Sequence, residues 1–444
     1  MEFGRDLKGG AKDVWSDAGA LERVPLSVLK RQTAAAGLAA HQAEPADRAS
    51  RLLAYAFLAS EVARRTGEPE CLAKAATAAE RAARLATHPH LVAAARIAQA
   101  AGALASGALF ADPTAADAAQ DWIATAEVAA TPSLADQAMA LRARIEASRA
   151  LGSADLDRAV QAGGVFDAAV ERLDAAVRDE GAHRSGAARV AAAALRCDRA
   201  EFLIAFGVRL KDRALVVQAE ADLRQLVARL DPDRLPLSWA RAEGLRGVAL
   251  SALGDLDGDA RPLTDSVKAL AAAVENADFD SSPLDRARLS HAMALSLQSL
   301  AEVCGDDIMY DHALAAFDQA VFGLEAAPTL PLRAMVIHDR AACVARRAER
   351  KRDPVALDRA EAAFRAQLTG GSAATDPIAW AVTQLALARV YDIRATFEGD
   401  LAPPSETAFA LTEAQDVFQE HGLKALADLA EDALARLRAA SGAN

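Results

Sequence analysis

The sequence predicts an all-α fold, a solenoid of about eight stacked antiparallel helix hairpins with capping helices at both ends. Alanine accounts for 116 of the 444 residues and aromatic residues for only 5%, and this composition favours helices packed closely through small side chains. A proline followed by a helical start recurs along the chain, and a small residue recurs at a fixed distance after it. Because one hairpin cannot bury its apolar face alone, stacked neighbours are expected to cover it.

The recurring prolines mark the starts of the first helix of each pair. Proline is tolerated in a first turn because its missing N–H would lack a partner there anyway. Successive prolines are separated by 44, 43, 104, 47, 48 and 46 residues: Pro45, Pro89, Pro132, Pro236, Pro283, Pro331 and Pro377. The gap of 104 residues spans two periods, so a unit without the proline is expected to begin within "SGAARVAAAALR", Ser185–Arg196. In "DPIAWAVTQLALARV", Asp376 is expected to cap the helix that Pro377 opens.

Two further positions repeat inside the units. The eleventh residue after each proline is small: Ala56, Ala100, Ala143, Gly247, Ala294, Ala342 and Ala388. A bulky residue follows 33 or 34 residues after five of the prolines: Trp122, Phe166, Leu270, Phe317 and Phe364. A small residue in mid-helix lets the neighbouring helix approach closely, and the bulky residues lie on apolar faces with helical spacing. Each unit is therefore expected to consist of helix A, a short linker, helix B and a loop.

The repeat divides the chain into four expected segments. Residues 1–44 form an N-terminal helical cap, 45–184 degenerate Ala-rich repeats, 185–422 more regular repeats, and 423–444 a C-terminal capping helix and tail. The N-terminus lacks the apolar core of a secretory signal. The longest apolar run, Leu91–Phe110, contains Arg96 and Gln99, so it is interpreted as a buried helix rather than a membrane span. A cytoplasmic location is expected by default.

Composition and motifs do not point to chemistry. The formal charge of −12, from 50 basic and 62 acidic residues, argues against a general nucleic-acid binder. No Gly-rich phosphate loop, nucleophile elbow or zinc motif occurs, so no catalytic residue, cofactor or metal site is predicted. The four cysteines form no CxxC pair and are interpreted as buried small hydrophobes: Cys71, Cys197, Cys304 and Cys343. "GDLDGDARP" resembles the start of a calcium loop, but Ala260 and Ser266 stand where Gly and Glu are needed, so an exposed acidic turn is expected.

From about Pro45 to His421, the chain resembles the tetratricopeptide-repeat superfamily. The resemblance lies in helix A with its small mid-helix residue and in the "A-x-x-A-F" of helix B, as at Ala313, Ala316 and Phe317. The family's standard unit has 34 residues, whereas this period is near 47, which is similar to a longer bacterial variety. The resemblance implies a right-handed superhelix with a concave groove lined by A helices. It also implies binding of peptides or helices of partner proteins, without chemistry of its own.

Two sets of polar residues are candidates for partner binding. Seven residues after each of the last four prolines stand Glu243, Ser290, His338 and Gln384, on one face of successive A helices. They are expected either to bridge neighbouring repeats or to line a polar groove. The second set is a basic stripe, Arg340, Arg347 and Lys351, in a chain that is otherwise acidic. It is either a solvated face with i,i+4 pairs to acids or an anionic docking site, for an acidic peptide segment or a C-terminal carboxylate.

Three functions from different classes remain open at this point. The leading hypothesis is a non-enzymatic scaffold or adaptor that binds a peptide or helix of a partner protein. The alternatives are an enzyme with an α/α toroid, which also chains helical hairpins, and a self-assembling structural array. Trp239 and Trp380 occupy equivalent positions, three residues after the proline, and are expected to pack between repeats rather than to contact a ligand.

Overall fold

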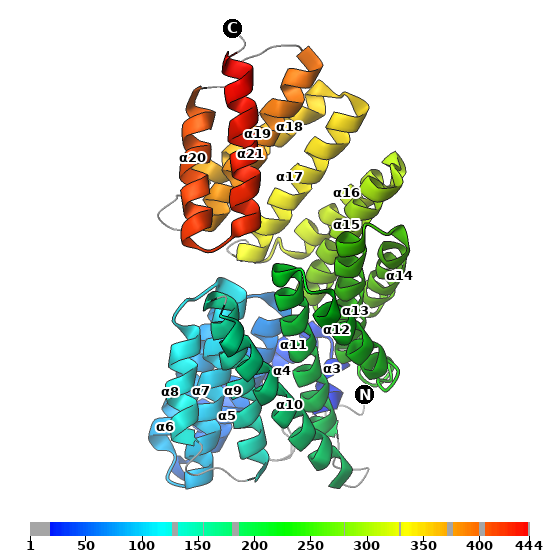
Figure 1. Ribbon diagram of the computed structural model, residues 1–444. Helices are drawn as coiled ribbons and strands as arrows, with labels where there is room; N and C mark the ends of the chain where they lie inside the picture. Colours follow the sequence, from blue (N-terminus) through cyan, green and yellow to red (C-terminus); the bar gives the residue numbers. More distant parts are fainter. Residues whose placement is uncertain are drawn as a thin grey trace. The chain divides into compact units, whose positions relative to one another are not determined.

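A computed structural model describes residues 18–126, 132–153, 155–179, 186–278, 280–327, 330–370, 376–398 and 405–442. Within these ranges the chain forms nineteen helices and no strand (Figure 1). The fold is therefore all-α, as the sequence predicts. The chain divides into two compact units. Unit 1 comprises Met1–Ser299 and Phe322–Pro331, and unit 2 comprises Leu300–Val321 and Leu332–Asn444.

The helices follow one another in pairs of a long helix A and a helix B. Two helices precede the first pair: α3 (Ala18–Glu22) and α4 (Leu26–Gln42). The first four pairs are α5 (Pro45–Thr66) with α6 (Pro69–Leu85), α7 (Pro89–Phe110) with α8 (Ala115–Ala126), α9 (Pro132–Ser153) with α10 (Leu156–Asp179), and α11 (Gly186–Leu210) with α12 (Arg213–Val227). The next four are α13 (Pro236–Asp257) with α14 (Ala260–Asn276), α15 (Pro283–Cys304) with α16 (Asp307–Gly323), α17 (Pro331–Lys351) with α18 (Pro354–Gly370), and α19 (Pro377–Glu398) with α20 (Ser405–Glu420). The described chain ends with α21 (Lys424–Gly442).

The helix boundaries have local causes that the sequence predicts. All seven recurring prolines open an A helix, and the unit without the proline begins at Gly186. The Asp376 carboxylate accepts a hydrogen bond from the Ala379 N–H at 3.0 Å and so caps α19. Several A helices end in a left-handed residue, such as Gly67 (φ 74°) after α5 and Gly258 (φ 64°) after α13, which glycine adopts without steric cost.

The repeated small and bulky residues lie at the helix contacts. Six of the seven small residues are buried, and Ala342 is half-buried. A Cβ atom on Gly247 would lie 2.6 Å from Leu270 Cγ of α14, so the small residue is what allows α13 and α14 to approach. Phe166, Leu270, Phe317 and Phe364 are all at most 1% exposed, while Trp122 is half-buried. The repeat pattern of the sequence is thus confirmed as an array of helix pairs.

Several neighbouring helix pairs share an apolar cluster within their own unit. In unit 1, α5 contacts α6, α6 contacts α7, and α7 contacts α8 and α9, and this order continues to α13 and α14. In unit 2, residues of α17, α18 and α19 form one cluster around Phe364, and α19 contacts α20 and α21. Trp239 packs against the cluster of α13, α14 and α15, and Trp380 against that of α19, α20 and α21. The expectation that both tryptophans pack between repeats is confirmed.

One described helix, α7, is long and apolar enough to cross a membrane by length and composition. Its residues Ala93, Ile97 and Ala100 belong to an apolar cluster shared with α8 and α9. Only 33% of the apolar window of α7 is buried, so the interpretation of this run as a buried helix stays a prediction.

Helices lie at both ends of the described chain, as the sequence predicts. The described part of residues 1–44 contains α3 and the longer α4, which packs on α5. The final helix α21 begins one residue after the expected Leu423. The compact units divide within α15 and α16, whereas the expected segments divide at residues 184 and 185 according to repeat regularity. The four expected segments therefore remain a sequence-based prediction, as does the right-handed superhelix.

The four cysteines differ in their exposure to solvent. Cys197 and Cys343 are buried, Cys71 is half-buried and Cys304 is exposed, so the expectation of burial is wrong for Cys304, which is the last residue of α15. In the acidic turn, the Asp259 side chain accepts a hydrogen bond from Arg261 N–H and caps α14. Its role in the structure is therefore that of a helix cap.

Candidate functional site

The predicted polar positions in unit 1 are buried. Glu243 is 7% exposed and Ser290 is fully buried. Glu243 Oε1 accepts a hydrogen bond from Arg246 at 2.8 Å, and Arg246 also donates to Glu220 of α12 at 3.2 Å. This chain of contacts joins helix A of the fifth pair to helix B of the fourth. Glu243 itself contacts only its own helix through Arg246, and it is Arg246 that reaches the neighbouring repeat, so the role of Glu243 stays a prediction.

The predicted polar positions in unit 2 are half-buried. His338 Nδ1 lies 3.2 Å from Gln367 Oε1 of α18, and its ring lies 5.1 Å from that of Phe364. Gln367 in turn donates to the Ala334 carbonyl of α17 at 3.0 Å. His338 thus faces its own B helix, and Gln384 lies half-buried on α19. Partner contacts by these four residues remain a prediction.

The basic stripe of α17 forms an in-register row of ion pairs with α16, which we call the cation row. Arg340 Nε lies 2.7 Å from Asp318 Oδ1, Arg347 2.6 Å from Asp311 Oδ1, and Lys351 Nζ 3.8 Å from Asp311 Oδ2. The cation side chains remain 40%, 29% and 36% exposed, respectively. The acids therefore come from the preceding helix rather than from i,i+4 neighbours. Whether the row also binds a partner remains a prediction.

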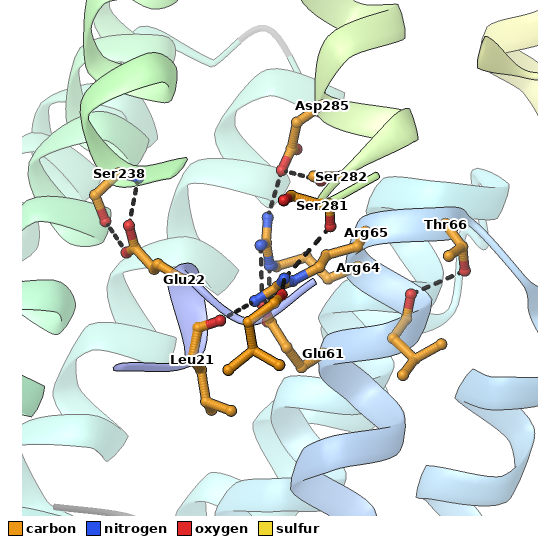
Figure 2. Close-up of polar contacts among 12 residues, drawn as sticks. Leu21, Glu22, Glu61, Arg64, Arg65, Thr66, Ser238, Ser281, Ser282 and Asp285 are labelled. Atoms are coloured by element: carbon orange, nitrogen blue, oxygen red, sulfur yellow. Dashed lines mark hydrogen bonds and ion pairs between the residues drawn. The ribbon is translucent and has the colours of Figure 1, made fainter. Parts of the chain in front are cut away.

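A polar cluster that sequence analysis did not identify lies in unit 1, at the C-terminal end of α5 (Figure 2). Arg65 is fully buried, and its guanidinium donates to the Leu21 carbonyl at 2.7 Å and to the Val24 carbonyl at 2.9 Å. It also donates to Glu61 Oε1 at 2.7 Å and to the Ser281 carbonyl at 3.3 Å. One side chain thus joins α5 to the segment before α4 and to the segment before α15. We call this cluster the buried junction.

Glu61 and Asp285 complete the buried junction. Arg64 donates to both oxygens of Glu61, at 2.8 and 3.0 Å, and to Asp285 Oδ2 at 2.9 Å. Burial alone would raise the pKa values of both carboxyls, but the positive charge of Arg64, the charge of a second arginine and the hydrogen bonds to each carboxyl together outweigh burial and lower them. Both acids are therefore held ionised, and they tie α5 to α15 across 221 positions of the sequence.

The segment Ala18–Leu26, which we call the N-terminal clasp, supplies the other side of this cluster. Glu22 accepts a hydrogen bond from the Ser238 N–H at 2.9 Å and another from the Ser238 hydroxyl (Figure 2). Leu26 N–H donates to the Asp280 carbonyl at 2.9 Å, and α3 also contacts α11. Burial raises the pKa of Glu22, and the Ser238 hydrogen bonds oppose this shift. The clasp therefore lies among A helices that are far from it in sequence.

The A helices of unit 1 also share a charged bridge. Asp198 of α11 pairs with Arg144 of α9 and with Arg241 of α13, the latter at 2.6 Å. Burial would raise the pKa of Asp198, but the two arginines lower it. Three successive A helices are thereby linked through one carboxylate.

The repeat does not single out Arg65. Twenty residues after the proline, four other units carry an apolar residue (Leu109, Leu256, Val303 and Phe397), one carries Gly152 and one carries the cation Lys351. A cation at this position is therefore exposed in one unit and buried in another. The partners of Arg65 could not be identified because they are backbone carbonyls from distant segments, which leave no pattern in the sequence. Across the part of the chain that the structure describes, no group of three or more His, Cys, Asp and Glu side chains could hold a metal ion.

No family model and no curated protein sequence matches this chain. Among solved structures, it is similar to a Rap protein complexed with competence and sporulation factor, with 11% identity and a TM-score of 0.49 over 88% of this chain and 98% of that one. It is also similar to a circular tandem repeat protein with novel repeat topology, with 14% identity and a TM-score of 0.27 over 95% of this chain and 97% of that one. Such low similarities carry no argument about a ligand, and the fold rests on this chain's own helix pairs.

Proposed function

We propose that this chain is a non-enzymatic scaffold or adaptor of the cytoplasm, which holds a peptide or helix of a partner protein on the A helices of unit 2. The cation row supports the proposal best. It presents three half-exposed positive side chains along one helix of an acidic protein. An acidic partner segment gains charge-assisted hydrogen bonds along such a row.

The existing ion pairs do not prevent this use. Asp318 is 61% exposed and Asp311 47% exposed, and exposed ion pairs contribute only about 0–1 kcal/mol each. A carboxylate from a partner can therefore share or replace these partners at small cost. An acidic helix laid along α17 would also lie near His338 and, on the next A helix, Gln384.

Affinity capture with the full chain tests the proposal. The variant carries Arg340→Gln, Arg347→Gln and Lys351→Gln, because glutamine removes the charge without creating repulsion with Asp311 and Asp318. A matched control replaces three exposed arginines elsewhere: Arg51→Gln, Arg81→Gln and Arg229→Gln. We expect mass spectrometry to identify proteins that wild type and control retain and that the α17 variant loses.

Two results would count against the proposal. If the α17 variant retains the same proteins in the same amounts, the cation row serves only to join α16 and α17. If capture is independent of salt between about 50 and 500 mM, charge does not drive it, because screening should weaken pairs of exposed charges. Turnover of a small molecule by the purified chain would instead favour the α/α-toroid enzyme, and concentration-dependent growth of assemblies would favour the structural array.

A further inference from the structure

We propose that the site holding the N-terminal clasp is a binding surface for a short helical segment of a partner protein, occupied in this structure by the chain's own residues 18–26. The inference extends the proposed function, on which it rests, to a second surface and a defined partner. That partner offers an aliphatic residue, a carboxylate directly after it, and a second aliphatic residue three positions after the first. Leu21, Glu22 and Val24 supply these groups in the clasp.

The carboxylate position is set by the N-terminus of α13. The residue before this helix is Leu235, whose side chain cannot cap the exposed N–H groups of the first turn. Glu22 supplies the missing acceptor from 216 positions away, through the Ser238 N–H and hydroxyl. A carboxylate is also favoured at this end of a helix by the helix dipole. The site therefore selects a side chain that accepts both hydrogen bonds of Ser238, as the carboxyl group of Glu22 does.

The aliphatic positions are set by α5. Leu21 and Val24 are 6% and 8% exposed and pack in one cluster with Leu58 and Val62 of α5. On the other side, a Cβ atom at Gly19 would lie 3.2 Å from Leu235 Cδ2, so the clasp fits closely between the two walls. The site thus combines two apolar contacts with one polar anchor.

The remaining recognition is of the backbone, which any helical segment can offer. Arg65 binds the Leu21 and Val24 carbonyls at and just beyond the end of α3, where the Leu21 carbonyl also accepts from the Val24 N–H at 2.9 Å. If the clasp left and only apolar groups replaced it, the buried guanidinium would lose two acceptors at a high cost in free energy. Exchange therefore favours an incoming segment that brings its own terminal carbonyls.

The clasp is suited to exchange because its helix is short. α3 has five residues, and isolated helices below about 12 residues are marginal in water. Its order therefore depends on the contacts of the site, and elements of this kind open most readily. A partner helix with the same three groups and a longer stable helix competes with it.

A peptide binding experiment with the full-length chain tests this inference. The probe is a fluorescent peptide with the sequence of residues 18–25, AGALERVP, measured by anisotropy. We expect no binding to wild type, whose site is occupied, and saturable binding to the variant Leu21→Asp/Glu22→Ala, whose own clasp is released. A probe with Glu22→Ala should bind this variant at least about tenfold more weakly, because it lacks the hydrogen bonds to Ser238. A chain with Glu44→Ala, which changes an exposed acid at the opposite end of α5, should behave as wild type.

Hydrogen exchange measured on the same samples controls for misfolding. The released variant should exchange faster at residues 18–26 and at the start of α13, with α8 and α10 unchanged, and the probe should restore protection at the start of α13. Equal binding of both probes, or protection that the probe fails to restore, would overturn the inference. The peptide probe is defined and the cation row is unchanged in these variants. A failure of the peptide experiment therefore does not affect the capture experiment on α17, and a failure of the capture experiment does not affect the peptide result.

Discussion

Arginines join helices in both units, but at opposite depths. In the buried junction of unit 1, Arg65 is fully buried and has four partners, two of them carbonyls of the N-terminal clasp. In the cation row of unit 2, Arg347 is 29% exposed and pairs with an aspartate that is itself 47% exposed. Loss of the arginine is therefore expected to be costly for stability in the buried junction and nearly neutral in the cation row. Water can replace a lost ion-pair partner only where the site is open to solvent.

The largest effect is expected for Arg65→Ala. It removes the charge that faces Glu61 and the guanidinium N–H groups that the Leu21 and Val24 carbonyls accept from, although the Leu21 carbonyl keeps the Val24 N–H. Breaking a buried ion pair from one side costs about 3–5 kcal/mol. Hydrogen exchange should report this loss in α5 and at the start of α15, while the helices of unit 2 serve as an internal reference. A change below about 1 kcal/mol would mean that water satisfies these carbonyls and that the junction is not dry.

The next largest effect is expected for Gly67→Ala, beside the buried junction. Gly67 has a left-handed backbone, and an added Cβ would lie 2.4 Å from Leu330 Cδ1. Backbone strain and overpacking together should cost about 2–3 kcal/mol. Gly258→Ala is the matched control, because Gly258 has φ +64° but no atom within 4 Å of an added Cβ, so only the backbone term of about 1–2 kcal/mol applies. Equal losses of thermal stability in the two variants would show that Leu330 moves aside.

Acid should distinguish two carboxyls of the same cluster. The pKa of Glu61 is lowered, because the charges of Arg64 and Arg65 outweigh the opposing effect of burial. Its contribution to stability is therefore present above the ordinary carboxyl pKa and is lost as pH falls through the lowered value. We expect the melting temperature of Glu61→Gln to lie below that of wild type at pH 7, with the difference shrinking below about pH 4.

The contribution of Glu22 to stability should depend on pH in the opposite direction to that of Glu61. Burial raises its pKa, so its contribution is fully present below the ordinary carboxyl pKa and is lost as pH rises through the raised value. The melting temperature of Glu22→Gln should therefore increase relative to that of wild type as pH rises from about 4 towards 7. Parallel pH profiles for Glu22→Gln and Glu61→Gln would contradict the assignment of opposite shifts.

The smallest effect is expected for Arg347→Ala in the cation row. A half-exposed ion pair contributes at most about 1 kcal/mol, and salt screens it. The free energy of opening of α16 and α17 should therefore fall by less than about 1 kcal/mol, and the difference from wild type should shrink at high salt. A loss as large as that of Arg65→Ala would show that the row is a structural junction and would weaken its assignment as a partner site.

The local features of this fold could be predicted because each has a short-range cause. Pro377 opens a helix since its ring fits the first turn, and Asp376 caps that helix from the adjacent position. Gly247 marks a close helix contact since no other residue leaves room for Leu270. The burial of Cys304 was wrongly predicted. Its position fits the apolar spacing of α15, but it is the last residue of that helix and is exposed.

The candidate sites were less predictable. The cation row could be found because its charges share one helix face, but its partners Asp311 and Asp318 depend on how α16 and α17 align. Glu243 and Ser290 share a repeat position with His338 and Gln384, yet they are buried while the latter two are half-buried. Repeat position therefore predicts the helix face and does not predict its depth.

By itself, the sequence determined that the chain is helical, where the helices begin and which residues lie between them, because helix propensity, capping and apolar spacing act over a few residues. Only the tertiary structure decided that Glu22 meets Ser238 and that Arg64 meets Asp285, contacts that span 216 and 221 positions. Their formation depends on small rotations summed over several helix pairs, which no short stretch of sequence records.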